Sequence, residues 1–207
     1  MQTLIKEPVT RNAKNTFNAI IDAAIDCFYE KGYHGTSVNT ITKNAGVAAG
    51  TFYLYFPSKL DLYKHLLIMF SHNIRREIAA KVSRVESRYD KEREGIKAFI
   101  ELVKSQPHMY NIIWESLYID RSLFKNYYAS FAERYVKGLD HSVESGEIRD
   151  VDTEVTSFIL MGITNFIGLK VMLDIGQNND DVDYIVNVVM DLIEHGLFIH
   201  KNQSITT

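Results

Sequence analysis

A scarcity of helix breakers constrains the fold of this chain more than any other feature of its sequence. The 207 residues include only three prolines, at positions 8, 57 and 107. Proline inside a helix removes a hydrogen bond and clashes with the preceding turn, so stretches without it leave room for long helices. Apolar residues recur at three- and four-residue spacing, first from about Asn15 to Lys31, which is the period of an amphipathic helix. The sequence therefore predicts an all-α fold.

Short helices come first along the chain and long ones follow. Ser37 can cap a short helix that runs through Asn44, and a second short helix is expected to end near Phe56. The expected divisions are a mobile N-terminal tail at 1–13, a three-helix head at 14–60 and a larger helical body at 61–207. The expected long helices of the body start near Ser58, Ile96, Pro107 and Asp120, with a loosened polar connection at 83–94 and two final helices after a turn at 146–150.

The two short helices enclose a glycine turn at Gly46. Helix, tight glycine turn and helix is the order of a helix-turn-helix, in which the second helix enters the DNA major groove. Phe52 and Phe56 lie four apart and can anchor this second helix to the core. From spacing alone, a plain helical hairpin with a tyrosine-rich surface remains an alternative.

Small and hydroxyl-bearing residues sit where DNA would approach this second helix. Ala48, Ala49 and Gly50 at its N-terminal end allow close approach, and free backbone N–H groups there attract anions. Residues with side-chain groups for bases or phosphate oxygens follow, namely Thr51, Tyr53, Tyr55 and Lys59. Residues 1–60 carry six Lys and Arg against four Asp and Glu, whereas the rest of the chain is acidic. This asymmetry has the sign expected of a DNA-facing head, although the net charge is −3.

The stretch GYHGTSVNTITKNAGVAAGTFYLYFPSKLDLY resembles the DNA-binding region of the tetracycline-repressor (TetR) family over roughly residues 14 to 65. The matching elements, in order and without a gap, are Gly32-Tyr33, Gly35-Thr36-Ser37, Ile41, Ala45-Gly46-Val47, Gly50-Thr51-Phe52-Tyr53, Tyr55-Phe56 and Ser58-Lys59. Ala48 stands where the family often has a capping serine, and Leu60 where an acidic residue is common. The resemblance implies a homodimeric, ligand-responsive repressor that binds a palindromic double-stranded DNA operator. The polar N-terminus lacks the hydrophobic core of a signal peptide, which predicts a cytoplasmic location.

The resemblance also implies roles for individual residues. Ser37 and Asn39 would lie near DNA at the start of the first motif helix. The recognition surface would comprise Ala49, Gly50, Thr51, Tyr53, Leu54 and Tyr55. Of these, Tyr53 and Tyr55, together with Lys59, would hold phosphates, and Thr51 and Leu54 would touch base edges.

The segment from Val155 to Leu173 is apolar nearly all round. Its 19 residues are enough for a membrane-spanning helix. However, it contains Asn165 and Lys170, and placing these side chains inside a bilayer would cost free energy. A soluble helix apolar on all sides is buried on all sides. Together with the final helix from Val182 to Phe198, it is expected to form a four-helix bundle with a second copy. Phe166 and Val189 are the proposed interface residues, without a decision on which faces the partner.

Aromatic residues crowd onto the predicted helices that begin near Pro107 and Asp120, and a pocket is expected between these helices and those that begin near Ser58 and Ile96. A packed aromatic core would explain them, but TetR relatives keep an effector cavity here, and apolar walls with a few polar groups suit a small-molecule site. The expected pocket residues are His72, Phe99, Tyr110, Trp114, Glu115, Tyr118, Phe124, Tyr128, Phe131 and Asn165. This lining favours a hydrophobic effector, which would swing the helix from Ser58 and change the distance between two heads.

Catalytic signatures are missing from the sequence, which has no G-x-S-x-G elbow, phosphate-binding glycine loop or H-E-x-x-H. No enzyme activity, cofactor or metal is therefore expected. Asp180, Asp181 and Asp183 are better explained as a helix start than as a metal cluster. The single cysteine, Cys27, excludes an intramolecular disulfide. The alternative function is a helical small-molecule carrier or enzyme with a vestigial head.

Overall fold

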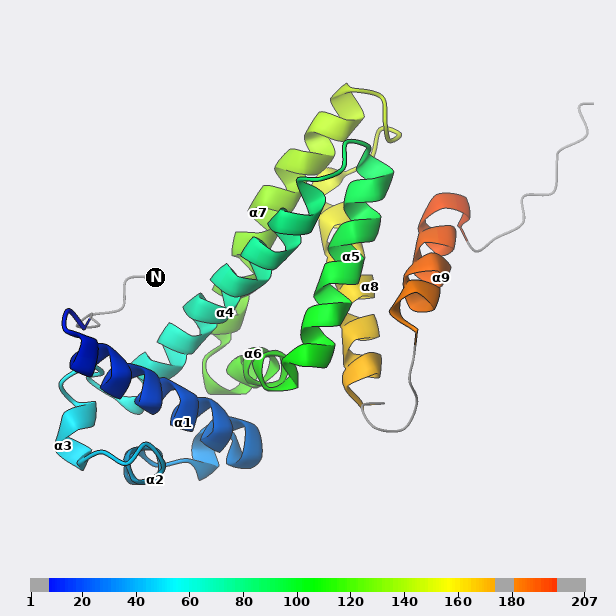
Figure 1. Ribbon diagram of the computed structural model, residues 1–207. Coiled ribbons are helices and arrows are strands. Elements are labelled where there is room, and N and C mark those ends of the chain that lie inside the picture. Colours follow the sequence, from blue (N-terminus) through cyan, green and yellow to red (C-terminus); the bar gives the residue numbers. More distant parts are fainter. Residues whose placement is uncertain (1–7, 174–180, 197–207) are drawn as a thin grey trace, which may run out of the picture.

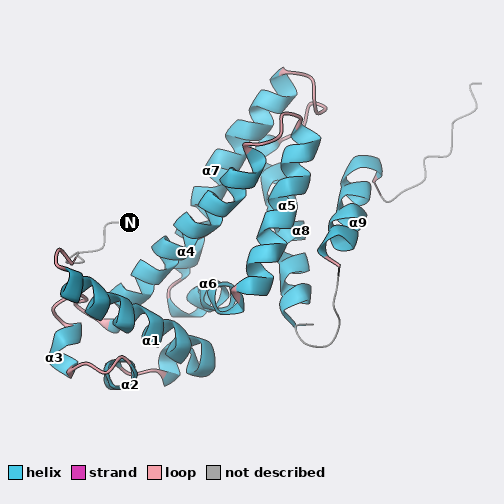
Figure 2. Cartoon of the chain, in the orientation of Figure 1, coloured by secondary structure: helices cyan, strands magenta, loops and turns pink. Residues whose placement is uncertain are grey.

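A computed structural model describes residues 8–173 and 181–196, and this part of the chain is helical without strands, as predicted (Figures 1 and 2). The helices, in order, are α1 (Arg11–Gly35), α2 (Val38–Asn44), α3 (Ala49–Phe52), α4 (Lys59–Val82), α5 (Arg88–Ser105), α6 (Pro107–Ile119), α7 (Arg121–Glu144), α8 (Thr153–Leu173) and α9 (Val182–His195). The first three form the head, and the remaining six form the body.

One hydrophobic core runs from the head into the body. Phe28 of α1, Phe52 of α3, and Phe56 after it are fully buried together with Leu66 of α4 and Ile112 of α6. Long helices α4, α5, α7 and α8 lie side by side in the body, while α6 lies across their end that faces the head (Figure 1). The shared core means that the head packs against α4 and α6 and is not a separate domain joined only by a linker.

A second core cluster docks α9 onto α5 and α8. Its buried members are Ile96, Ile100, Val171, Ile185, Val186, Val189 and Met190. Lys97 and Arg93 of α5 add ion pairs to Asp183 at the start of α9, at 2.7 and 3.6 Å. Hydrophobic burial therefore fixes one face of α9 inside its own protomer.

Several predicted boundaries are corrected by capping interactions. Helix α1 begins at Arg11, inside the predicted tail, because Thr10 Oγ1 accepts a hydrogen bond from Ala13 N. The connection expected at 83–94 is shorter, since Ser87 caps α5 and Arg88 pairs with Glu92 one turn later. Helix α3 has only four residues and ends at Phe52. Asp180 and Phe198 lie outside the described residues.

Among the described residues, α8 is the one helix that is long and apolar enough to cross a membrane. In the structure it packs closely against α5. A Cβ atom at Gly168 would lie 2.9 Å from the Phe99 ring, so the glycine permits the helices to approach. The opposite face of α8 carries exposed apolar side chains. Helix α8 therefore has one face in the protomer core and an opposite face with large apolar side chains that stay half or more exposed.

Candidate DNA-binding head and effector groove

The predicted helix-turn-helix is present in the head. Ser37 Oγ accepts a hydrogen bond from Thr40 N at 3.0 Å, which caps α2 at the predicted residue. Gly46 then adopts a φ of 67°, a left-handed conformation that glycine reaches without strain. Val47 N donates to Thr42 O across this turn, and α3 begins two residues later. Ala48 precedes α3 without a side-chain cap, as its missing hydroxyl predicts.

Helix α3 and the turn after it expose most of the predicted recognition surface. Tyr53 is 59% exposed and Leu54 is 64% exposed. Phe52, which directly precedes them, is fully buried. Ala49 and Gly50 are exposed and Thr51 is half-buried. On α2, Asn39 is exposed, and the Ser37 hydroxyl is already used by the cap. The buried phenylalanine thus orients α3 so that the short and hydroxyl-bearing side chains point to solvent.

Two predicted phosphate ligands have structural partners instead. Lys59 Nζ donates to the carbonyls of Tyr33 and Thr36, both at 2.6 Å, and lies 4.1 Å from the centre of the Tyr33 ring. Tyr55 Oη donates to Ala13 O at 3.2 Å and packs edge-on against Phe17. Burial lowers the pKa of Lys59, and the Glu115 carboxylate opposes that effect. In this structure both residues therefore fasten the head together, and their role as phosphate ligands stays a prediction.

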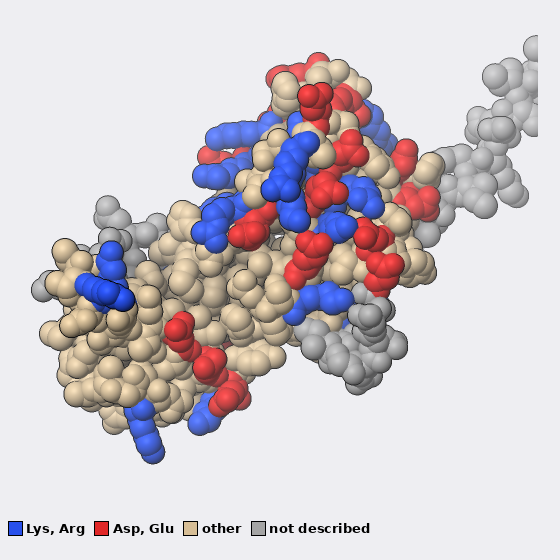
Figure 3. Space-filling view, in the orientation of Figure 1, with Lys and Arg blue, Asp and Glu red and all other residues tan. Residues whose placement is uncertain are grey.

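Charged side chains are distributed unevenly over the visible face of the molecule. Figure 3 shows mixed Lys, Arg, Asp and Glu over the end of the body far from the head, and few charges on the visible face of the head. Contact with DNA from this head would therefore depend on the polar and small residues of α2 and α3 as well as on scattered cations.

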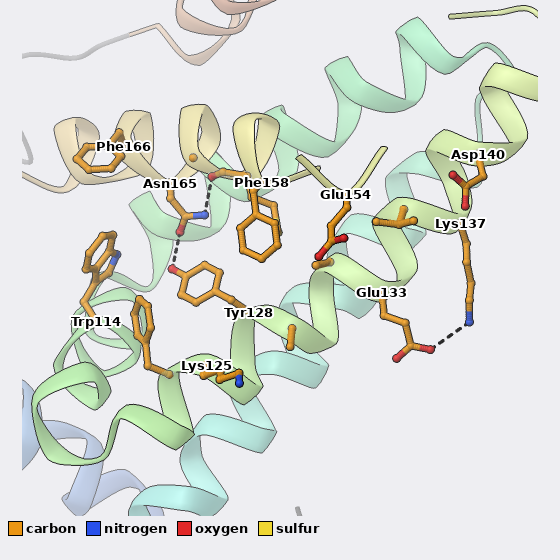
Figure 4. Close-up of a pocket in the computed structure, with 16 residues that line it drawn as sticks. Trp114, Lys125, Tyr128, Glu133, Lys137, Asp140, Glu154, Phe158, Asn165 and Phe166 are labelled. Carbon is orange, nitrogen blue, oxygen red and sulfur yellow. Dashed lines mark hydrogen bonds and ion pairs between the residues drawn. The ribbon is translucent and has the colours of Figure 1, made fainter. Parts of the chain in front are cut away.

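A groove of 840 Å³ lies between α6, α7 and α8 (Figure 4). It is lined by Trp114, Phe124, Lys125, Tyr128, Ala129, Ala132, Glu133, Val136, Lys137, Asp140, Glu154, Phe158, Met161, Gly162, Asn165 and Phe166. Trp114 and Phe166 lie at one end of the groove, whereas Lys137 and Asp140 lie at the other. The groove therefore has apolar walls, an aromatic end and a charged end.

Tyrosine hydroxyls make the main polar links beside the aromatic end. Tyr128 Oη donates to Asn165 Oδ1 at 3.0 Å, and Tyr110 Oη donates to the carbonyl of Asn165. Asn165 Nδ2 in turn donates to Met161 O at 2.7 Å. Burial raises the pKa of Tyr110 to about 12 and also raises the pKa of Tyr128. Both hydroxyls therefore remain protonated donors at neutral pH.

The structure brings four of the ten predicted pocket residues into the groove lining, namely Trp114, Phe124, Tyr128 and Asn165. Phe99 and Tyr110 are buried behind it, and Phe131 packs on the first core beside Arg75. His72 and Tyr118 are exposed on the surface. Glu115 points to the head, where it accepts a hydrogen bond from Tyr33 N. These six residues lie outside this groove because helix rotation, and not residue type, decides which side chains face it, and their contact with an effector stays a prediction.

Helix α8 supplies a groove wall that the sequence prediction assigned to other helices. Phe158, Met161, Gly162 and Phe166 line the groove from this helix, and the described parts of α4 and α5 contribute no lining residue. The all-round apolar character of α8 is a usable signal: the sequence prediction gives the helix one side against its own body and one against a second copy, but it places only Asn165 of this helix in the pocket. Phe166 has both properties, since it lines the groove and is 65% exposed.

The two proposed interface residues differ in position. Val189 is only 5% exposed and packs in the second core cluster, so of the two residues it is the one that faces the core of its own protomer. Phe166 is one of the exposed apolar side chains of α8 and α9, which together are called the outer stripe. This outer stripe consists of Val155, Phe158, Ile159, Phe166, Leu173, Tyr184, Val188 and Leu192.

Comparison with known proteins gives related sequences and folds. Residues 20–66 match the family described as bacterial regulatory proteins, tetR family. The fatty acid metabolism regulator protein of Bacillus subtilis (strain 168) is 42% identical over 71 residues, which span 32% of this chain and only 37% of that relative.

Solved structures share the fold over most of the chain. The fatty acid degradation regulator FadR from Bacillus halodurans has a TM-score of 0.80 at 20% identity, covering 94% of this chain and 100% of that one. The transcriptional regulator FadR from Bacillus subtilis, solved in complex with stearoyl-CoA, has a TM-score of 0.75 at 23% identity, covering 88% of this chain and 100% of that one. At these identities the likeness shows a common fold from head to body.

Proposed function

We propose that this chain, as a member of the tetR family of bacterial regulatory proteins, is a cytoplasmic repressor. Long-chain acyl-CoA is the proposed effector that releases it from DNA. Its family and fold make it a transcriptional regulator with a DNA-binding helix-turn-helix. The effector class, the direction of regulation, the dimer and the palindromic operator are the proposed parts.

The groove between α7 and α8 carries this proposal. From Phe124 to Asp140 it follows α7 over seventeen residues, and the sixteen steps between them at the helical rise amount to roughly 24 Å. Its walls are mainly phenylalanine, alanine, valine and methionine side chains. An extended hydrocarbon chain fits such a long narrow shape better than a sugar or a nucleotide base. Each buried methylene contributes about 0.8 kcal/mol, so chain length would set affinity.

Two relatives support an acyl effector. The Bacillus subtilis relative with 42% identity is named for fatty acid metabolism, and the structural neighbour FadR was solved with stearoyl-CoA. In the present chain, Lys125 and Lys137 lie on the groove lining. Lys137 pairs with Glu133 at 3.1 Å, so Lys125 is the lining lysine that would meet an anionic headgroup at the rim. We place the acyl chain in the groove and the coenzyme A headgroup outside it.

The outer stripe of α8 and α9 supports a homodimer. Monomeric proteins rarely expose a large contiguous apolar surface, and a second copy would bury this stripe by the same residues on both sides. Two heads would then face two half-sites of a palindrome, with α3 of each head in a major groove. Effector binding would favour a body conformation in which the heads no longer fit both half-sites.

A gel-shift titration tests the proposed function. The DNA upstream of the protein's own gene is titrated with protein, alone and with stearoyl-CoA, and coenzyme A without an acyl chain is the control. We expect stearoyl-CoA to release the DNA and coenzyme A to leave it bound. A Gly162→Phe variant should bind DNA but ignore stearoyl-CoA, because a Cβ atom at this groove residue meets open space and the ring would fill the groove. Release by coenzyme A, or no release by stearoyl-CoA, would refute the acyl effector.

A further inference from the structure

Helix α6 lies between the groove and the head, and two successive residues on it face these two sites. Trp114 lines the aromatic end of the groove. The next residue, Glu115, reaches in the other direction and contacts the end of α1. Because both side chains project from one helical turn, a rotation or shift of α6 at Trp114 displaces Glu115 as well.

The contact between Glu115 and the head is a short hydrogen bond to the backbone. Glu115 Oε1 accepts from Tyr33 N at 2.7 Å, across 82 positions in the sequence. Gly32 just before it leaves the helical conformation with a φ of 68°. A Cβ atom at Gly32 would lie 2.7 Å from Glu115 Oε1. Glycine therefore provides both the backbone turn and the space for the carboxylate.

The same peptide segment is held from its other side by α4. Lys59 at the start of α4 donates to Tyr33 O and Thr36 O. Tyr63, one turn further along α4, donates through its hydroxyl to Ile112 O of α6. The backbone at Tyr33 is thus a joint where the head, α4 and α6 meet, and the carboxylate of Glu115 is the α6 component of that joint.

We propose that Glu115 is the positioning residue that couples the effector groove to the DNA-binding head. In the effector-free state its carboxylate fixes the end of α1 and so fixes the angle of the head relative to the body. An effector that displaces Trp114 at the aromatic end moves Glu115 away from Tyr33 N and frees the head. The inference rests on the proposed function for its effector, but the joint itself also predicts coupling between DNA and the groove.

Measured coupling provides the test. Stearoyl-CoA affinity is measured from emission of Trp114, the only tryptophan in the chain, with and without the DNA upstream of the gene. Allosteric coupling factors are typically about 5- to 150-fold and are reciprocal between the two ligands. In Glu115→Ala we expect the factor to fall to within about twofold of unity, and stearoyl-CoA affinity without DNA to rise, because the effector no longer has to break the hydrogen bond to Tyr33 N.

Matched variants separate a positioning role from a general loss of charge. Glu115→Gln keeps a side-chain oxygen that can accept from Tyr33 N, and it should retain most of the coupling. Glu101→Ala removes a carboxylate of similar exposure to solvent from the outer pair with Lys81, away from the head, and should retain all of it. Equal coupling in Glu115→Ala and wild type would overturn the inference.

Two readouts keep this result distinct from failure of the proposed function. If stearoyl-CoA does not bind, the acyl proposal fails, and the joint is then tested by Trp114 emission on addition of DNA, which should change in wild type and not in Glu115→Ala. Amide hydrogen exchange at Tyr33 should accelerate in Glu115→Ala even without any ligand. Wild-type exchange rates at Tyr33 in Glu115→Ala, or emission that responds to DNA equally in both proteins, would overturn the role of Glu115.

Discussion

At the scale of single residues, partners decide what a side chain does. Lys59 has the charge of a phosphate ligand, but its ammonium group is held by two carbonyls and the Tyr33 ring. The Tyr53 side chain is 59% exposed. Its hydroxyl makes no hydrogen bond to another of the described residues. The two residues therefore have different expected roles, although they lie only six positions apart.

Substitutions at these two positions should separate stability from DNA affinity. Lys59→Ala removes two hydrogen bonds from a charged donor, and each such bond contributes about 1.5–3 kcal/mol, so its melting temperature should drop. Tyr53→Phe removes only an exposed hydroxyl, so we expect weaker DNA binding with an unchanged melting temperature. Calorimetry and gel-shift titration measure the two effects. A Lys59→Ala protein with the stability of the wild type would contradict the joint at Tyr33.

At the scale of helices, three tyrosine hydroxyls tie neighbouring elements to each other. Tyr63 links α4 to α6, Tyr110 links α6 to α8, and Tyr128 links α7 to α8. Burial raises the pKa of all three above the ordinary value, because the charged phenolate would lose its hydration. The helices around the groove thus depend on protonated tyrosines.

Alkaline pH should therefore loosen these helices. The folded pKa values lie above the unfolded value of about 10, so this stability is complete below that pH and is lost as the pH rises through the folded values. We expect the melting temperature, measured by circular dichroism, to fall steeply above about pH 10. Tyr110→Phe should show a shallower fall, since one buried hydroxyl is absent. Tyr118→Phe is the control, because that residue is 82% exposed, and the same slope in both variants would argue against the assignment.

At the scale of the whole molecule, one face of α9 is buried in its own protomer and another face is exposed. Val189 lies in the second core cluster of its own protomer, while its neighbour Val188 is 52% exposed on the outer stripe. One apolar helix can thus contribute to the protomer core and leave a second surface for another copy.

Adjacent substitutions on α9 should distinguish folding from assembly. Val188→Asp places a charge on the outer stripe, so we expect a folded monomer with much weaker operator binding, because one head meets only one half-site. Val189→Asp buries an unpaired charge and should lower the melting temperature or prevent folding. Sedimentation velocity and circular dichroism together measure these outcomes. A Val188→Asp protein that remains dimeric would exclude this face as the interface.

The sequence by itself determined the elements with local causes. Ser37, Gly46 and Pro107 act through the backbone within a few residues, so the cap, the turn and the start of α6 were predictable. The head was recognisable because its motif lies in one continuous stretch. Helical spacing likewise predicted the long helices of the body, whose apolar residues repeat along each segment.

Only the tertiary structure decided which helix faces meet. Trp114 and Glu115 are neighbours on α6, yet one lines the groove and the other contacts the head. Lys59 finds its carbonyl partners more than twenty positions away. Helix periodicity gives the angle between side chains on one helix, but the rotation of that helix against its neighbours follows from packing the whole core. The groove wall from α8 and the inward turn of Val189 arise from that packing, which no local pattern encodes.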